Sequence, residues 1–349
     1  MKSTELKYLY KADWQKIKGY ISKVWGKTHP LTDQRLFLWQ HTGPLTVENP
    51  YLCTALEENS EIVGLRCIQQ LDFQLKNETG SLTTIRGCTA PFMFVSKSHR
   101  GIAGLRLYRR TLSDFPVVLF LGANTKTTLK LHQKSGYKIF HELPRYGIQH
   151  LESCTRHKIS LTDHSINIFL LSDLWRKYSL FYKPFAIYRD ERFFDWRYKL
   201  APYWNYRMLV SSNNNAVVVY RLEPFLDKTG NMARAIRLVE FFYDPEKCTE
   251  TELVAFSSSI IEFSISLGCS YTDHFQTMVD SQVIFEKAGF TRISADTKDF
   301  PVLFNPLSYD KPAINYGWFT KENFGYEESC HYITKTDSDQ DRPQQISRG

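Results

Sequence analysis

The first 150 residues alternate between short apolar runs and helical periodicity. Apolar runs at 92–95 and 115–121 are typical of buried strands, whereas Leu105, Tyr108 and Leu112 recur at helical spacing. In chain order, the pattern predicts strand 6–9, helix 13–25, helix 33–39, hairpin 51–75, strand 91–95, helix 101–112, strand 115–121, helix 124–134 and strand 137–140. This order predicts an α/β (α+β) fold, in which helices flank a mixed, mostly antiparallel twisted sheet.

The same order of elements begins again after residue 176, and two short sequence matches indicate a repeat. Residues 33–39 and 190–196 share the pattern D-x-R-x-F-x-W, and residues 131–137 resemble residues 284–290. Because both matches recur in the same order at nearly the same separation, they favour duplication of one unit. The two motif tryptophans, Trp39 and Trp196, are predicted to pack in the core. The predicted organisation is a first unit at 1–150, a connector at 151–176, a second unit at 177–310, and an extension at 311–349 with a disordered tail from Asp337.

The segment from Pro91 to Leu112 predicts a place to bind phosphate. A buried strand is followed by a polar turn and a helix that contains Gly101 and Gly104 near its start. Backbone N–H groups at a helix N-terminus point outward, and the helix dipole favours an anion there. Five basic side chains lie in or beside this turn: Lys97, Arg100, Arg106, Arg109 and Arg110. An ordinary strand-to-helix turn with a solvated basic face is the alternative interpretation.

The corresponding turn of the second unit has the opposite character. Residues 244–250 contain no glycine, and three carboxylates, Asp244, Glu246 and Glu250, replace the basic cluster. These carboxylates would repel a phosphate. The sequence therefore predicts that only the first unit keeps an anion site.

Composition limits the classes of partner. The chain has 42% hydrophobic and 23% charged residues, as is typical of a soluble globular protein, and its net charge is only +7. This modest, dispersed positive charge suits an anionic small ligand better than nucleic acid. The first residues lack the apolar core of a signal peptide, and no apolar run is long enough to span a bilayer. We therefore expect a cytoplasmic protein, with its oligomeric state left open.

Cysteine and histidine spacing predicts neither a disulfide framework nor a metal site. The seven cysteines form no C-x-x-C pair, and an odd, scattered set favours reduced thiols. His150, His157 and His164 recur at a spacing that fits no usual metal motif, so we interpret them as surface or loop histidines.

This arrangement resembles the GNAT N-acetyltransferase superfamily in a tandem form. The core motif of that superfamily is V-x-x-x-x-[QR]-x-x-G-x-[GA]. Aligned on Val95, Arg100 takes the Gln/Arg place, and Ala103 and Leu105 stand at the two small positions. Shifted by two residues, Gly101 and Ala103 fit the small positions instead. The second part of the pattern, an asparagine followed by a helix ending in -Y-e-k-x-G-[FY], is matched by Asn124 and by residues 134–137, with His132 at the tyrosine position.

The resemblance implies an acyl-CoA donor, most simply acetyl-CoA, bound where two neighbouring strands separate. Phe94 and Val95 would align the pantetheine, and Asn124 would orient the pantetheine or a water molecule. The pyrophosphate would lie on backbone N–H groups of residues 101–105: Gly101, Ile102, Ala103, Gly104 and Leu105. No metal is implied.

The same resemblance implies direct attack of an amine on the thioester, aided by one acid and one base. His132 is the candidate acid, although a solvent-facing imidazole is the alternative interpretation. The candidate bases are Asp72, on the preceding strand, and Glu240, on the matching strand of the second unit, although both are also explained as ordinary structural carboxylates.

Three functions remain open at this stage. The first is an acyl-CoA-dependent N-acyltransferase that acts on a small amine or an amino sugar. The second is a FemABX-like transferase that takes its acyl group from aminoacyl-tRNA, which would bind RNA with a steep salt dependence. The third is a non-catalytic binding or scaffold protein, consistent with the imperfect glycine pattern and with His132 in place of tyrosine.

Overall fold

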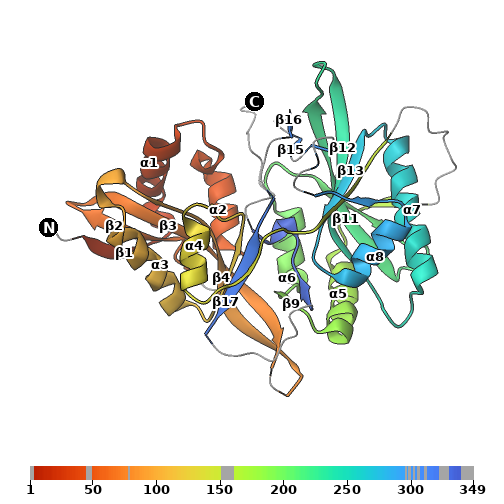
Figure 1. Ribbon diagram of the computed structural model, residues 1–349, viewed down its shortest axis with the longest axis horizontal. Helices are drawn as coiled ribbons and strands as arrows, with labels where there is room; N and C mark the ends of the chain where they lie inside the picture. The colour runs from red at the N-terminus through yellow and green to blue at the C-terminus, as the bar shows by residue number, and fades with distance from the viewer. Residues whose placement is uncertain are drawn as a thin grey trace.

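Two twisted sheets form the two lobes seen in Figure 1. The computed structural model describes residues 4–338 except 45–48, 78, 151–160, 295–296, 298–299, 302, 305–306, 310–312 and 322–329. The predicted fold class is confirmed: both sheets are mixed, mostly antiparallel and flanked by helices.

The first lobe contains a sheet of nine strands in which β1 to β5 are neighbours in order. Helices α1 and α2 precede β2, α3 connects β4 to β5, and α4 follows β5, as the periodicity predicts. The elements are β1 (Glu5–Leu9), α1 (Trp14–Trp25), α2 (Gln34–Thr42), β2 (Cys53–Glu58), β3 (Glu61–Lys76), β4 (Leu82–Val95), α3 (Ile102–Asp114), β5 (Val117–Leu121), α4 (Thr128–Lys134) and β6 (Lys138–Phe140), with short 3-10 turns at Lys11–Asp13, Pro30–Thr32 and Lys97–His99.

The second lobe is built around a sheet of seven strands, β14-β7-β13-β12-β11-β10-β8. In this part of the chain the elements are β8 (Thr162–Ser165), α5 (Ile168–Tyr182), β9 (Phe185–Ile187), α6 (Glu191–Phe194) with a π-helical turn at Asp195–Lys199, β10 (Tyr206–Val210), β11 (Ala216–Leu226), β12 (Met232–Tyr243), α7 (Glu250–Ser266), β13 (Tyr271–Phe275), α8 (Val279–Lys287) and β14 (Thr291–Arg292), of which β9 joins the first sheet. A small two-stranded sheet, β15 (Leu303–Phe304) and β16 (Leu307–Ser308), follows.

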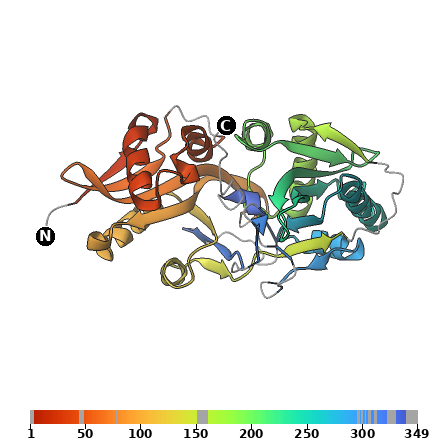
Figure 2. The same cartoon turned by 90° about the horizontal axis from the view of Figure 1, so that it is seen from above.

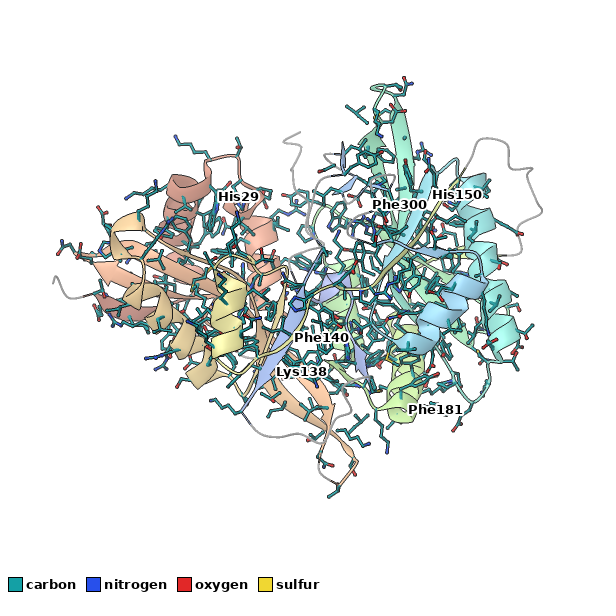
Figure 3. The ribbon with its side chains drawn as sticks, viewed as in Figure 1. His29, Lys138, Phe140, His150, Phe181 and Phe300 are labelled. Atoms are coloured by element: carbon teal, nitrogen blue, oxygen red, sulfur yellow. A yellow bond between two sulfur atoms is a disulfide. The ribbon has the colours of Figure 1, made fainter. Side chains whose placement is uncertain are left out.

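The two halves of the chain exchange strands. Strand β7 (Arg145–Gln149) follows the first lobe in the chain but pairs with β13 and β14 of the second sheet. Strand β17 (Tyr316–Thr320) follows the second lobe but lies between β5 and β6 of the first sheet. Figure 2 shows these crossings from above, and Figure 3 places Lys138 and Phe140 of the first lobe beside β17, with Phe140 stacked 4.7 Å from the Tyr316 ring. Strands β9 (Phe185–Ile187) and β18 (His331–Tyr332) also belong to the first sheet, where β9 pairs with β3 and β18 pairs with β9. Chain position and sheet membership therefore differ at these four strands.

The two copies of the repeated motif meet between the lobes. Asp33 and Asp190 each accept a hydrogen bond from a backbone N–H and so begin their helices. The Nε1 of Trp39 donates to the carbonyl of Trp196 at 2.8 Å, and the Nε1 of Trp196 donates to the carbonyl of Trp39 at 2.9 Å. The rings stack 5.3 Å apart. The prediction that both tryptophans serve packing is confirmed.

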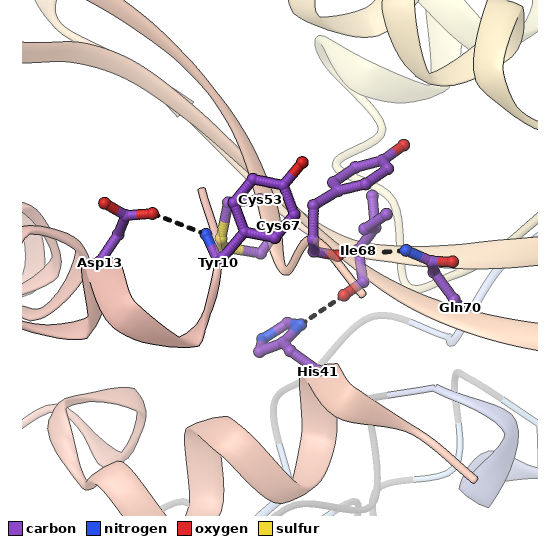
Figure 4. The surroundings of a disulfide bond; sticks show 8 residues. Tyr10, Asp13, His41, Cys53, Cys67, Ile68 and Gln70 are labelled. Atoms are coloured by element: carbon purple, nitrogen blue, oxygen red, sulfur yellow. Dashed lines mark hydrogen bonds between the residues drawn. A yellow bond between two sulfur atoms is a disulfide. The ribbon is translucent and has the colours of Figure 1, made fainter. Parts of the chain in front are cut away.

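One disulfide bond contradicts the expectation of reduced thiols. Cys53 on β2 and Cys67 on β3 are bonded to each other, as Figure 4 shows. The antiparallel register of β2 and β3 places these residues directly opposite, with their Cα atoms 4.1 Å apart. Both cysteines lie in the predicted hairpin 51–75, but a bulge between Leu56 and Glu57 sets the register that brings them together, and the cysteine spacing does not reveal this bulge. Cys154 lies outside the described residues.

Candidate functional site

The strands β4 and β5 form a fork. They pair in parallel at three positions, Gly87–Val117, Cys88–Val118 and Thr89–Leu119, and beyond Thr89 no ladder pair joins them among the described residues. Gly87 is required at the base, because a Cβ atom there would lie 2.6 Å from the carbonyl oxygen of Val117. A bulge in the β3–β4 ladder follows at Ala90 and Pro91, and Pro91 has no N–H group for a ladder.

The turn predicted to bind phosphate lies after the end of β4. Gly101 has φ +95°, a left-handed conformation that favours glycine, and its missing Cβ would meet no atom within 4 Å. The first helical hydrogen bond of α3 runs from the N–H of Leu105 to the carbonyl of Gly101. The N–H groups of Ile102, Ala103 and Gly104 therefore have no partner within the helix. Their position supports the sequence-based expectation of an anion site.

The five cations beside this turn are not equivalent. Arg106 donates to the hydroxyl of Thr4 at 2.6 Å, and Arg110 pairs with Asp114 at 2.9 Å, so both are held by the rest of the lobe. Lys97, Arg100 and Arg109 are exposed and form no ion pair with any residue that the structure describes, but Arg109 lies about two turns along α3, whereas Lys97 and Arg100 lie in the turn itself. These two side chains remain available to an anionic ligand at the helix start.

Asn124 begins the segment that leads from β5 into α4. Its Oδ1 accepts hydrogen bonds from the N–H groups of Lys126 and Thr127, while the exposed side chain leaves Nδ2 available as a donor. The preceding residue, Ala123, is held at both its N–H and its carbonyl by the side chain of Asn315, which precedes β17. The sequence analysis missed Asn315, because only the strand exchange brings it here.

His132 is buried on α4, which rules out the solvent-facing interpretation. Its Nδ1 lies 2.8 Å from the Tyr108 hydroxyl, and its ring stacks on Phe120 with centroids 4.2 Å apart. Burial, together with the positive charge of Arg66, lowers the pKa of His132 to about 3. At neutral pH the imidazole is uncharged, so it holds no imidazolium proton to give to a leaving thiolate.

Neither predicted base lies in the fork. Asp72 is opposite Arg86 on the outer part of the β3–β4 hairpin, and its Oδ1 accepts from the Nε of Arg86 at 2.7 Å. Glu240 is fully buried in the second lobe, where its Oε1 accepts from Arg189 at 3.0 Å and from Tyr198 at 2.7 Å. Both carboxylates have structural partners, which corrects the expectation that either one faces the donor.

A second fork, between β12 and β13, is filled by the C-terminal segment. Pairing of these strands ends at Leu238–His274, and Glu240 follows. The Tyr332 hydroxyl, from β18 (His331–Tyr332), donates to Oε2 of Glu240 at 2.7 Å. Asp337, where the sequence predicted a disordered tail, is buried and pairs with Arg189 at 2.5 Å. The prediction is therefore wrong for Asp337, while residues 339–349 lie outside the described residues.

The histidines that were predicted to lie on the surface or in loops differ in burial. His150 is partly buried and lies 3.0 Å from the Ser264 hydroxyl and 2.9 Å from the Thr272 hydroxyl, whereas His164 is exposed on β8 and His157 lies outside the described residues. No group of three His, Cys, Asp or Glu residues in the described part of the chain is arranged to hold a metal ion. None of the described helices is long and apolar enough to cross a bilayer.

Comparison with known proteins places this fold among acyltransferase structures. No family model matches the sequence, and no curated protein matches it. A GCN5-related N-acetyltransferase from Anabaena variabilis matches with a TM-score of 0.58 and 10% identity over 90% of this chain and 72% of its own. A putative acetyltransferase from Pyrococcus horikoshii matches with a TM-score of 0.52 and 12% identity over 97% of this chain and 96% of its own.

A yeast protein with a bound donor gives a similar match. The Saccharomyces cerevisiae N-myristoyltransferase, solved with myristoyl-CoA and inhibitors, has a TM-score of 0.52 and 8% identity over 97% of this chain and 86% of its own. At these identities the likeness concerns the fold. The chain therefore shares the fold of GCN5-related (GNAT) acyltransferases.

Proposed function

We propose that the protein is an acyl-CoA-dependent N-acyltransferase whose donor binds in the fork between β4 and β5. The observation that supports this most directly is the difference between the two forks. The first combines unpaired strand edges with an open helix N-terminus and two unpaired cations, whereas Tyr332 and Asp337 fill the second. Among the described residues, it is the first fork that offers open helix N–H groups and exposed cations to an anionic coenzyme.

In this proposal each part of the fork binds one part of the donor. The pyrophosphate lies on the N–H groups of Ile102, Ala103 and Gly104, close to Lys97 and Arg100. The pantetheine runs along the unpaired edge of residues 90–95, and Nδ2 of Asn124 donates to it. A backbone N–H of this edge polarises the thioester carbonyl.

The reaction then needs little besides positioning. The acceptor amine forms a bond to the carbonyl carbon, the carbon–sulfur bond breaks, and the thiolate leaves with the proton that the amine gives up. The acyl group is acetyl in the simplest case, and the acceptor is a small amine or an amino sugar. His132, Asp72 and Glu240 are not assigned as acid or base here, because the contacts described above engage all three.

Calorimetric titration with acetyl-CoA tests the proposal. We expect saturable binding in the micromolar range, and a loss of about ten-fold in affinity for Arg100→Ala, because charge-assisted hydrogen bonds contribute about 1.5–3 kcal/mol. Arg109→Ala is the matched control, since Arg109 is exposed further along α3 and should leave the affinity unchanged. A folded protein that shows no heat with millimolar acetyl-CoA would exclude the proposal.

A second candidate function is binding of acyl-CoA without catalysis. It is favoured by the finding that none of the three predicted catalytic side chains is available at the fork. A thiol-release assay on a panel of amines separates the two candidates. Saturable acetyl-CoA binding with no thiol released above the rate without protein would favour the binding protein.

A further inference from the structure

Arg66 on β3 is a buried cation with no anionic partner. Its side chain is only 2% exposed, and its guanidinium lies 5.0 Å from the centre of the Tyr108 ring. Nη1 contacts the sulfur of Met93 at 3.6 Å, and Nε is buried without a hydrogen-bond partner. No described residue forms an ion pair with it.

The groups around this guanidinium are all uncharged at neutral pH. Burial lowers the pKa of His132 to about 3 and raises the pKa values of Cys88, Tyr108 and Tyr137. Asp114, at the end of α3, is engaged by Arg110, Tyr8 and Tyr51 instead. A positive charge that is almost wholly buried beside neutral neighbours is costly to keep, because no counter-ion and little water replace its hydration.

The second lobe shows that the fold does not need an arginine at this position. In the first sheet, the last residue of β4 that pairs with β5 is Thr89, and Gln69 lies opposite it on β3. In the second sheet, the last residue of β12 that pairs with β13 is Leu238, and Tyr220 lies opposite it on β11. Three positions before Gln69, Arg66 lies opposite Met93. Three positions before Tyr220, Val217 lies opposite Phe242. An apolar residue fills the equivalent place in the second lobe, so packing alone does not account for Arg66.

The position of Arg66 relates it to the fork. Met93 lies on the part of β4 that no longer pairs with β5, and it is partly exposed. Methionine is unbranched and flexible, so its side chain is able to move from the guanidinium when a ligand enters. The start of α3 at Gly101 lies seven residues before Tyr108, about 10 Å along the helix, so a pyrophosphate held there would not reach Arg66.

We propose that Arg66 binds a substrate carboxylate in the fork. A carboxylate matches the planar guanidinium with two parallel hydrogen bonds and neutralises the buried charge. This inference rests on the proposed function and narrows its substrate class. The carboxylate belongs either to the acyl group, as in a dicarboxylic acyl-CoA, or to an acceptor such as an amino acid.

Paired substrates test this proposal and distinguish the two sources. In the donor arm, the affinity for succinyl-CoA is compared with that for butyryl-CoA, which has the same number of acyl carbon atoms and no carboxylate. In the acceptor arm, turnover of amino acids is compared with turnover of the amines that lack their carboxylate. We expect at least a ten-fold preference for the carboxylate in one arm, lost in Arg66→Met without a change in acetyl-CoA affinity. Arg100→Ala is the control, since it should weaken both thioesters alike.

Stability of the ligand-free protein gives a readout that does not depend on coenzyme A. Arg66→Met should melt at or above the temperature of the parent protein, because it removes an uncompensated charge and keeps an apolar stem. Free succinate should raise the melting temperature of the parent and not that of Arg66→Met. Arg66→Gln repeats the comparison if the methionine variant does not fold.

The outcomes separate this inference from the proposed function. If acyl-CoA binds but neither arm prefers a carboxylate and succinate has no effect, the role of Arg66 is refuted and the proposed function stands. If no acyl-CoA binds, the proposed function fails, and the succinate measurement alone decides whether Arg66 holds a carboxylate.

Discussion

At the scale of the residue, His132 shows how burial decides what an ionisable side chain does. The Tyr108 hydroxyl and the Phe120 ring enclose the imidazole, and Arg66 adds a positive charge nearby. Each of these factors penalises the protonated form, so the ring behaves as a neutral aromatic group. Protonation of His132 is therefore unfavourable in the folded protein, and this makes the free energy of unfolding depend on pH.

We predict that acid destabilises the protein partly through His132. An unfolded histidine has a pKa of about 6.5, whereas the pKa of folded His132 is about 3. Between these values the unfolded state binds a proton that the folded state does not, so the free energy of unfolding falls by about 1.4 kcal/mol per pH unit as the pH decreases. Urea unfolding of His132→Phe between pH 4.5 and 7 should show a slope that is smaller by this amount.

His150 adds to the same slope, because burial lowers its pKa to about 4. Equal slopes for His132→Phe and the parent protein would show that the imidazole is accessible to protons in the folded state.

At the scale of the element, β17 supports the fork from outside the first half of the chain. Its residues pair with both β5 and β6, and Asn315 just before it bonds Ala123 at the end of β5. The neighbouring N–H of Gly122 also donates to the carbonyl of Asn315. The loop that carries Asn124 is therefore positioned by a strand from the far end of the sequence.

We predict that Asn315→Ala weakens donor binding without touching the donor. The substitution removes hydrogen bonds of 2.8 and 2.9 Å to Ala123, at a cost of about 1–3 kcal/mol in unfolding free energy. Hydrogen exchange should rise at residues 122–124, and affinity for acetyl-CoA should fall several-fold. Lys321→Ala, at the other end of β17, is the control; equal exchange in both variants would contradict the predicted role.

The elements were predictable from the sequence where the signal is local. The fork's strands, the glycine at the start of α3 and the helix ending before Gly136 follow from periodicity and capping. Two features could not be predicted: the Cys53–Cys67 bond depends on a bulge that shifts the register of the predicted hairpin 51–75, and the burial of Asp337 depends on which distant segments become neighbours. The buried charge at Arg66 could have been suspected from the sequence, because Arg66 is the one arginine in the apolar run of β3.

At the scale of the whole molecule, the contact between Trp39 and Trp196 joins the lobes symmetrically. Each indole donates to the other residue's carbonyl, and the rings stack. Because the same motif supplies both sides, the contact is self-complementary in the manner of a two-fold dimer within one chain. It is therefore a site where the lobes are expected to be energetically coupled.

We predict strong non-additivity between Trp39→Phe and Trp196→Phe. Each substitution removes one indole donor and should cost about 1–2 kcal/mol in unfolding free energy. The double variant should cost less than the two single costs together, because the partners share one stack and one pair of bonds. Urea denaturation of the four proteins gives the coupling energy, and Trp25→Phe with Trp39→Phe serves as an additive reference pair. Additive costs at Trp39 and Trp196 would mean that the contact does not couple the lobes.

The place of β17 in the first sheet also constrains how the protein is made. A ribosome delivers the chain from the N-terminus, so β5 and β6 emerge long before residues 316–320 are translated. Until then the nascent N-terminal half has an unfilled slot between these strands, with unpaired backbone groups on both sides. Pairing of β5 and β6 through β17 therefore waits until the second lobe, which lies between β6 and β17 in the chain, has been translated.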